Sequence, residues 1–181
     1  MNLPNLITVF RIVLIPFFLN FLVYGYTDLA LIVFLVAGLT DALDGAIARM
    51  TKTKSEIGAA LDPLADKMLA LAAFVALTIL GKIPLWLTLT VVTRDVIVVT
   101  GSVILYIQGY DLKIRPTIAG KMATFFQLLL LAVALLSVYM KRDFAAIDYL
   151  VWVALALTVA SGAQYVIRGF ALAGAGEQRA K

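Results

Sequence analysis

Residues 28–48, DLALIVFLVAGLTDALDGAIA, form an apolar run that carries two aspartates, Asp41 and Asp44, close to its end. A run of roughly 20 apolar residues is long enough to cross the core of a bilayer as a helix. The chain contains further runs of this kind at about 5–24, 60–80, 84–107, 118–140 and 146–169. Because the connections are short, we predict an all-α polytopic membrane protein, a bundle of six transmembrane helices. We assign residues 1–172 to this single domain and expect residues 173–181 to form a disordered C-terminal tail.

The composition and the loop charges agree with a membrane location. Hydrophobic residues make up 63% of the chain and charged residues 14%, whereas soluble domains contain roughly 45–50% and about 25%. Lysine and arginine are enriched in cytoplasmic loops, and most loop cations fall on the side of the N-terminus. They are Lys52, Lys54, Lys113, Arg115, Arg168, Arg179 and Lys181, against Lys82, Lys141 and Arg142 on the other side. We therefore expect both termini and the loop after Asp44 to be cytoplasmic, in a bacterial inner or cell membrane.

The basic residues also argue against two other interpretations. The first apolar run has no basic segment before it and contains Arg11, so we expect a retained helix rather than a signal peptide. The positive-inside bias accounts for most of the net charge of +4. We therefore expect membrane lipid, and no nucleic acid, as the partner of these charges.

Acidic and small residues are arranged in two helical stripes on either side of the polar connection MTKTKSEI, residues 50–57. With the period of a helix, the first stripe contains Asp41, Asp44, Gly45 and Ala48, and the second contains Gly58, Asp62 and Asp66. Such stripes face protein or water rather than lipid. Two adjacent antiparallel helices can therefore point four carboxylates into one cleft near the cytoplasmic surface.

Four carboxylates placed together need counter-charge. A single Asp at the bilayer centre costs about 2.5–3.5 kcal/mol, and like charges at close range repel one another. The nearby cations in the helical scheme are Arg49, Lys67 and, further along the chain, Arg94 or Lys121, whereas two divalent cations would neutralise the cluster. Cys and His are absent, which excludes thiol nucleophiles and histidine bases, and carboxylate ligands favour Mg²⁺ or Mn²⁺. A pair of such ions about 3.5–4 Å apart suits phosphoryl or phosphodiester chemistry.

The glycines and the arginine of this segment fit a phosphate-containing substrate. Gly45 lies one turn before Arg49, so its missing side chain leaves room for a phosphate beneath a guanidinium that binds it through two parallel hydrogen bonds. Gly58 lets a ligand approach the backbone where the third helix begins. Either glycine alone is more typical of a packing residue between membrane helices, whereas the combination of acids, glycines and arginine favours a site.

The pattern Asp41-x2-Asp44-Gly45-x2-Ala48-Arg49-x8-Gly58-x3-Asp62-x3-Asp66 resembles the signature of the CDP-alcohol phosphotransferase family, with every position filled. The resemblance implies a six-helix membrane homodimer that transfers the phosphatidyl group of CDP-diacylglycerol to a hydroxyl acceptor and releases CMP. It further implies that Asp41, Asp44 and Asp62 bind two metal ions, and that Asp66 is a ligand of one ion and the general base. By the same resemblance, Gly45, Arg49 and Gly58 lie against the cytidine diphosphate.

Other segments bear on the acceptor. The opening MNLPNLITVFRIVLIP, with Asn5, Thr8 and Arg11 on one helix face, resembles the phosphatidylglycerophosphate synthase and cardiolipin synthase branch, although a capped first helix would explain it equally well. The segments VAGLTDALDG, ALDPLADK, VTRDVIVVTG and IRPTIAGKMATFFQ resemble the CDP-lipid-dependent cardiolipin synthases more closely. In the glycerol-phosphate enzymes, the segment that corresponds to Thr93-Arg94-Asp95 more often reads Ala-Arg-Glu. We therefore favour phosphatidylglycerol as acceptor, with glycerol 3-phosphate as the alternative.

Three basic residues are candidates for binding the acceptor. Arg94, next to Asp95, lies in the middle of the fourth apolar run, where an ionisable pair is a functional candidate. The pair could instead be a buried structural lock between helices. Arg115 and Lys121 flank the start of the fifth run, where they could hold a phosphate or anchor the helix at the lipid headgroups.

Two other classes of protein also use buried acidic residues. Membrane prenyltransferases place aspartate-rich motifs and magnesium on helices, but those motifs lie on widely separated helices. Here Asp41 and Asp66 are only 25 positions apart. A divalent-cation transporter would line a path with carboxylates, but it does not explain Arg49 beside them.

Overall fold

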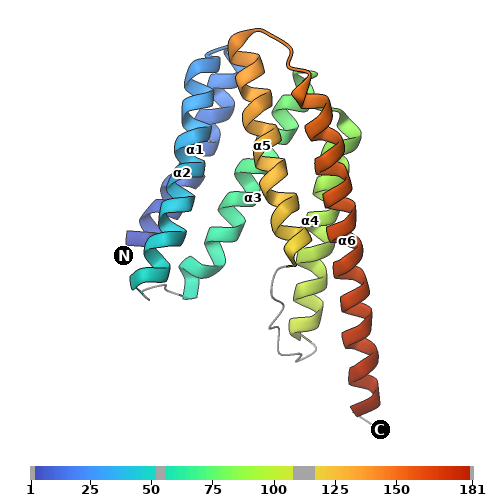
Figure 1. Cartoon of the computed structure of the whole chain (residues 1–181). Coiled ribbons are helices and arrows are strands. Elements are labelled where there is room, and N and C mark those ends of the chain that lie inside the picture. Colours follow the sequence, from blue (N-terminus) through green and yellow to red (C-terminus); the bar gives the residue numbers. More distant parts are fainter. Residues whose placement is uncertain (1–2, 52–55, 108–116, 180–181) are drawn as a thin grey trace. The chain divides into compact units, whose positions relative to one another are not determined.

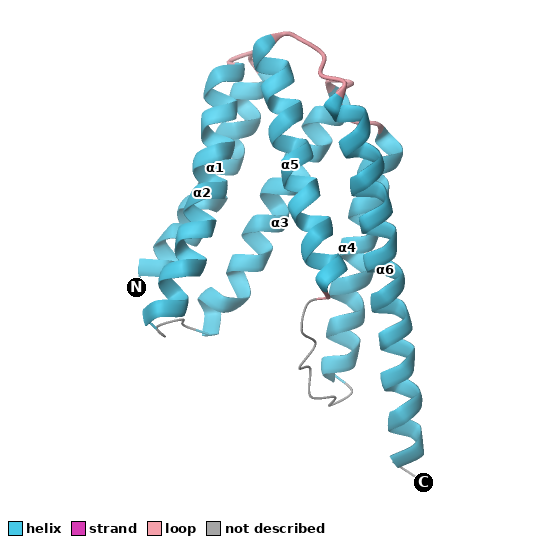
Figure 2. Ribbon diagram, in the orientation of Figure 1, coloured by secondary structure: helices cyan, strands magenta, loops and turns pink. Residues whose placement is uncertain are grey.

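The computed structural model describes the backbone of residues 3–51, 56–107 and 117–179, and the side chains of residues 10–40, 67–104 and 117–169. In this part of the chain the structure consists of six helices and contains no strand (Figures 1 and 2). They are α1 (Leu3–Val23), α2 (Thr27–Thr51), α3 (Glu56–Ile79), α4 (Leu85–Ile107), α5 (Ile118–Met140) and α6 (Ala146–Arg179). The prediction of an all-α protein is confirmed, and each helix coincides with one apolar run.

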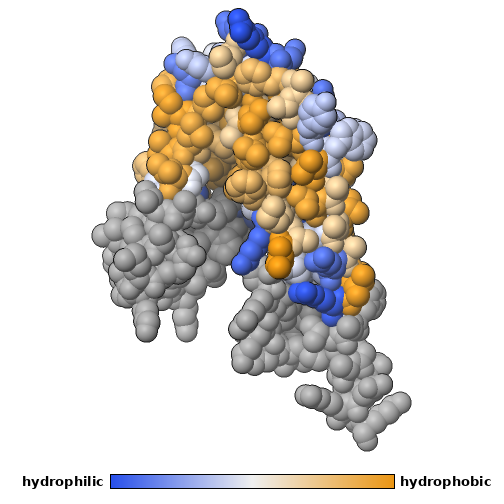
Figure 3. Space-filling model, viewed as in Figure 1, coloured by the Kyte–Doolittle hydropathy of each residue, from blue (hydrophilic) through white to orange (hydrophobic). Residues whose placement is uncertain are grey.

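Three helical segments among the described residues are long and apolar enough to cross a membrane, namely Leu85–Ile104, Ile118–Met140 and Ala146–Gly169. The described apolar parts of α1, α2 and α3 are shorter, covering Phe10–Val23, Thr27–Thr40 and Lys67–Ile79. These three segments are therefore of the membrane-spanning type, while the prediction of six crossings stays a prediction. Hydrophobic side chains cover much of the outward surface of the described helices (Figure 3).

The chain divides into two compact units. Unit 1 comprises Met1–Ile83 and Leu131–Phe144, and unit 2 comprises Pro84–Leu130 and Ala145–Lys181. In unit 1, α1 packs against both α2 and α3. The ring centroids of the buried Phe18 and Phe34 lie 6.0 Å apart at the α1–α2 contact.

Three helices of unit 1 end in the same hydrogen-bonded turn, the Schellman motif, in which a residue in the left-handed conformation follows the helix. After α1 this residue is Gly25, with φ +80°, and the Tyr26 N–H donates to the Phe21 carbonyl over 2.8 Å. After α3 it is Gly81, with φ +70°, and after α5 the same place is taken by Lys141, with φ 51°. The left-handed conformation is unfavourable for a residue with a side chain, so this third turn carries backbone strain.

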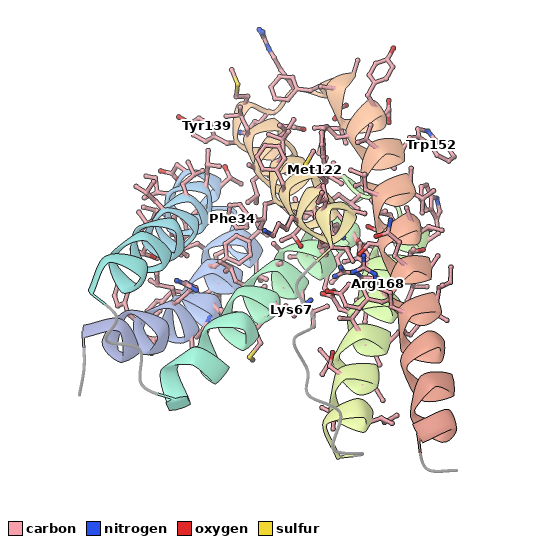
Figure 4. All side chains as sticks on the ribbon, turned by 60° about the horizontal axis from the view of Figure 1, so that its bottom comes forward. Phe34, Lys67, Met122, Tyr139, Trp152 and Arg168 are labelled. Atoms are coloured by element: carbon pink, nitrogen blue, oxygen red, sulfur yellow. The ribbon has the colours of Figure 1, made fainter. Side chains whose placement is uncertain are left out.

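In unit 2, α4 packs against α6. Near their first turns the rings of Trp86 and Trp152 lie 5.6 Å apart, and Trp152 is 64% exposed on α6 (Figure 4). Deeper in the unit, Gln127 Nε2 on α5 donates to Thr158 Oγ1 on α6 over 2.8 Å, and both residues are buried. Aromatic rings at helix ends and interhelical amide–hydroxyl hydrogen bonds are both typical of membrane proteins.

The C-terminal segment differs from our expectation of disorder. The helix α6 continues to Arg179, so most of residues 173–181 are helical. Alanine, glutamate, glutamine and arginine have high helix propensity, and they extend the helix through the two glycines of the sequence AGAGEQR.

Candidate functional site

The four aspartates of the sequence motif lie on two helices of unit 1. Asp41 and Asp44 belong to α2, and Asp62 and Asp66 belong to α3. Both helices pack against the same neighbour, α1. The backbone is helical at all four positions, so the spacing of three or four residues places each pair on one helix face.

The side chains that would make the ligand contacts fall outside those that the structure describes. They are the four aspartates together with Gly45, Arg49 and Gly58. Their proposed roles as metal ligands, general base and cytidine diphosphate contacts therefore stay predictions. The structure shows the helical framework of the motif, in which both motif-bearing helices pack against α1.

Arg11 is a site candidate whose burial we did not predict from the sequence. It lies on α1 and is only 1% exposed, which makes it one of the largest fully buried side chains of the described part of the chain. A guanidinium in an apolar helix is costly unless compensated, and α1 contacts the two helices that carry the aspartates. The signal available in the sequence was a single cation inside the first apolar run.

Unit 2 contains a second polar cluster, centred on Arg94 of α4. Arg94 is 8% exposed. Its Nη1 donates to Asp95 Oδ1 and its Nη2 donates to Ser161 Oγ on α6, each over 2.7 Å. The guanidinium carbon also lies 5.8 Å from the centroid of the Tyr165 ring, within the range of a cation–π interaction.

The start of α5 lies directly against this guanidinium. The Gly120 N–H donates to Thr117 Oγ1 over 3.0 Å, which caps the first turn of the helix. A Cβ atom on Gly120 would lie 3.1 Å from Thr117 Oγ1, 3.3 Å from Arg94 Nη2 and 3.4 Å from Ser161 Oγ. Glycine is therefore the residue that lets the α5 turn approach the buried charge.

The predicted acceptor-binding residues differ in their surroundings. Lys121 follows Gly120 and is exposed. Arg115 falls outside the described residues, so its role stays a prediction. Arg94 is buried and hydrogen-bonded to two partners, which favours its alternative interpretation as a structural lock. On α6, Arg168 is an exposed cation (Figure 4).

Comparison with known proteins decides the family. The family model for CDP-alcohol phosphatidyltransferases matches residues 1–160. The chain belongs to this family. It is therefore an enzyme of phospholipid synthesis, a CDP-alcohol phosphatidyltransferase, and the prenyltransferase and transporter interpretations can be set aside.

Relatives of this phosphatidyltransferase divide between two acceptors. A probable phosphatidylglycerophosphate synthase of Mycobacterium tuberculosis H37Rv is 34% identical over 92% of this chain and 81% of its own. A CDP-diacylglycerol–glycerol-3-phosphate 3-phosphatidyltransferase of Bacillus subtilis is 32% identical over 91% and 93%. The CMP-forming cardiolipin synthase of Rattus norvegicus is 33% identical over 90% of this chain, which spans 59% of that relative. These similarities leave the acceptor undecided.

The carboxylates of the sequence motif are of the donor type that suits hard divalent cations. Among the side chains that the structure describes, there is no group of three or more Asp, Glu, His or Cys that could hold a metal ion. The four motif aspartates lie outside that set, on α2 and α3. With neither Cys nor His anywhere in the sequence, these carboxylates are the donor set that fits Mg²⁺ or Mn²⁺.

Proposed function

We propose that the enzyme transfers the phosphatidyl group of CDP-diacylglycerol to a glycerol-type hydroxyl, with phosphatidylglycerol as the favoured acceptor and cardiolipin as product. The acceptor oxygen attacks the phosphorus that carries the lipid. The bond from that phosphorus to the CMP oxygen breaks, and CMP leaves with the bonding electrons. The observation that carries this reaction is the complete aspartate motif on α2 and α3, two helices that pack against the same neighbour.

The residues of the motif divide the chemistry between them. Asp41, Asp44 and Asp62 would hold two divalent cations, with Asp66 as a ligand of one of them. When bound, these ions supply compensation for the charge of the pyrophosphate and of the departing CMP. Asp66 accepts the proton of the attacking hydroxyl, one turn after Asp62 on α3.

Gly45, Arg49 and Gly58 would receive the cytidine diphosphate. An arginine presents a planar fork that matches phosphate oxygens in pairs. The glycines remove side chains where the nucleotide would approach the helix backbone. Arg11, buried on α1, supplies a fixed positive charge beside the two aspartate-bearing helices.

The membrane topology that we propose has six crossings, with both termini and the aspartates on the cytoplasmic side. One ion pair in unit 1 supports it. Lys82 Nζ, after α3, lies 2.5 Å from Asp143 Oδ1, after α5. Two odd-numbered crossings end on the same side of a membrane, so this contact is compatible with six alternating crossings. The cytoplasmic assignment rests on the loop charges. A homodimer, expected from the family resemblance, belongs to the same proposal.

The choice of phosphatidylglycerol rests on the segments that resemble cardiolipin synthases, including Thr93-Arg94-Asp95. We propose that Lys121, exposed at the start of α5, and Arg115 bind the acceptor phosphate. Glycerol 3-phosphate is the second candidate, because the relative from Bacillus subtilis matches along 93% of its length.

The test is a reaction with two acceptors offered side by side. Purified enzyme in liposomes with magnesium and CDP-diacylglycerol would receive glycerol 3-phosphate and phosphatidylglycerol in parallel, and mass spectrometry would identify the lipid product. Cardiolipin with release of CMP supports the favoured acceptor. Phosphatidylglycerophosphate would replace it with the second candidate, and the absence of CMP release with either acceptor would contradict both.

A further inference from the structure

Arg94 is enclosed by its neighbours rather than open to a ligand. Its two terminal nitrogens donate to Asp95 and Ser161. Its Nε is buried and has no hydrogen-bond partner in the described part of the chain. The aliphatic stem is covered as well, since a Cβ on Gly162 would lie 3.5 Å from Arg94 Cγ. A substrate phosphate that approached from solvent would have to displace these groups.

The same guanidinium joins three helices of unit 2. Arg94 lies on α4 and Ser161 lies on α6, 67 positions later. Gly120, in the first turn of α5, approaches both side chains. A buried charge with two charge-assisted hydrogen bonds is more rigid than an apolar contact, because each donor has a preferred direction. The first turn of α5 is therefore held by Arg94 on one side and by its own Thr117 cap on the other.

We propose that Arg94 is a positioning residue for the acceptor substrate. Together with Ser161 of α6, it fixes the position of the first turn of α5 at Gly120. That turn carries the exposed Lys121, and the N-terminus of a helix is itself favourable for a phosphate. When the contacts of Arg94 change, the turn shifts, and Lys121 no longer meets the acceptor in the right place. This inference rests on the proposed acceptor role of Lys121.

If Arg94 positions this turn, residues that do not touch the acceptor still control the acceptor's affinity. Removal of Ser161 Oγ takes away one hydrogen bond to a charged donor. We expect Ser161→Ala to raise the KM for the acceptor about threefold to tenfold, in line with the loss of a single hydrogen bond. The kcat and the KM for CDP-diacylglycerol should stay close to those of the wild type, because the aspartate motif belongs to other helices.

A matched control exists one turn earlier on α6. Thr158 is fully buried, as Ser161 is, and its hydroxyl also makes one hydrogen bond to a neighbouring helix, to Gln127 of α5. Thr158→Val and Ser161→Ala each delete one buried hydroxyl. We expect both to lower the thermal midpoint in detergent, and only Ser161→Ala to raise the acceptor KM.

A second pair of variants acts by addition rather than removal. In Gly120→Ala the new methyl group meets Arg94 Nη2 at 3.3 Å and Thr117 Oγ1 at 3.1 Å, so the turn or the guanidinium must move. In Gly101→Ala, on α4, the new methyl group has nothing within 4 Å. The acceptor KM should rise in Gly120→Ala and remain unchanged in Gly101→Ala.

Lys121→Ala separates this inference from the function on which it rests. A raised acceptor KM in Lys121→Ala, Ser161→Ala and Gly120→Ala, with a normal KM for CDP-diacylglycerol, supports the positioning role. A raised acceptor KM in Lys121→Ala alone would overturn it and leave the acceptor role of Lys121 intact. An unchanged acceptor KM in Lys121→Ala would overturn both. Equal effects of Ser161→Ala and Thr158→Val on the acceptor KM would reduce Arg94 to a general stabilising residue and also overturn the proposal.

Discussion

The two polar clusters of this protein are built in different ways. In unit 1 the four aspartates belong to two consecutive helices and lie within residues 41–66. In unit 2, Arg94, Gly120 and Ser161 come from three helices and are gathered by packing. The first cluster follows from spacing along the chain, and the second exists only when the helices meet. We therefore expect variants of the first to affect the chemical step and the CDP-lipid, and variants of the second to affect the acceptor.

Asp66→Asn tests the chemical role of the first cluster. The amide keeps a shape similar to that of the carboxylate but cannot accept the hydroxyl proton, so we expect kcat to fall by about 10²–10⁴. At saturating magnesium, binding of CDP-diacylglycerol should remain largely intact, because Asp41, Asp44 and Asp62 still hold the ions. Equilibrium binding and CMP release, measured on the same preparation, test both statements. A near-native kcat would show that Asp66 is not the base.

Asp41→Asn and Asp44→Asn should act on the metal requirement. Loss of a partner outside the ligand shell already costs about tenfold to a hundredfold in metal affinity, so loss of a ligand should cost at least as much. We expect the magnesium concentration for half-maximal activity to rise accordingly. Magnesium titrations of wild type and variants measure this shift, and superimposable curves would discredit the two residues as ligands. Thr158→Val, in unit 2, is the control that should leave the curve unchanged.

A modest change in stability is expected from the turn after α5 in unit 1. Lys141 occupies the left-handed position of its turn with φ 51°, whereas Gly25 and Gly81 fill the equivalent positions after α1 and α3. Lys141→Gly should stabilise the protein by about 0.5–1 kcal/mol, because strain is removed at some cost in chain entropy. The thermal midpoint in detergent should rise, with both KM values unchanged. A lower midpoint would show that the turn is not strained.

Much of the fold could be predicted from the sequence because apolar runs and helix periodicity are local properties. The helices α2 and α3 coincide with the runs at 28–48 and 60–80 to within a few residues. The continuation of α6 to Arg179 was missed, since the polar composition of the tail outweighed its helix propensity. The division into two compact units depends on tertiary packing and has no counterpart in the sequence pattern.

For the candidate site, the sequence predicted the family, while the roles of the individual motif residues stay predictions. The aspartate motif predicted the family, which the comparisons confirm. The burial of Arg11 and Arg94 could not be predicted, because a basic residue in an apolar helix can equally line a cavity or be enclosed by neighbours. The pairing of Gly120 with Ser161 had only a weak signal, namely small residues in membrane helices, which mark close packing without naming the partner.

The account is tested most directly by two single variants in the same kinetic assay, one at a residue next to each cluster in the sequence. Arg49→Lys replaces the proposed bidentate phosphate contact with a point charge, and Lys121→Ala removes the proposed acceptor contact. The KM for CDP-diacylglycerol and the KM for the acceptor would be measured for both. The account predicts that Arg49→Lys raises only the first and Lys121→Ala only the second. If both variants raised the same constant, or if neither raised any, the assignment of the two clusters to different substrates would be contradicted.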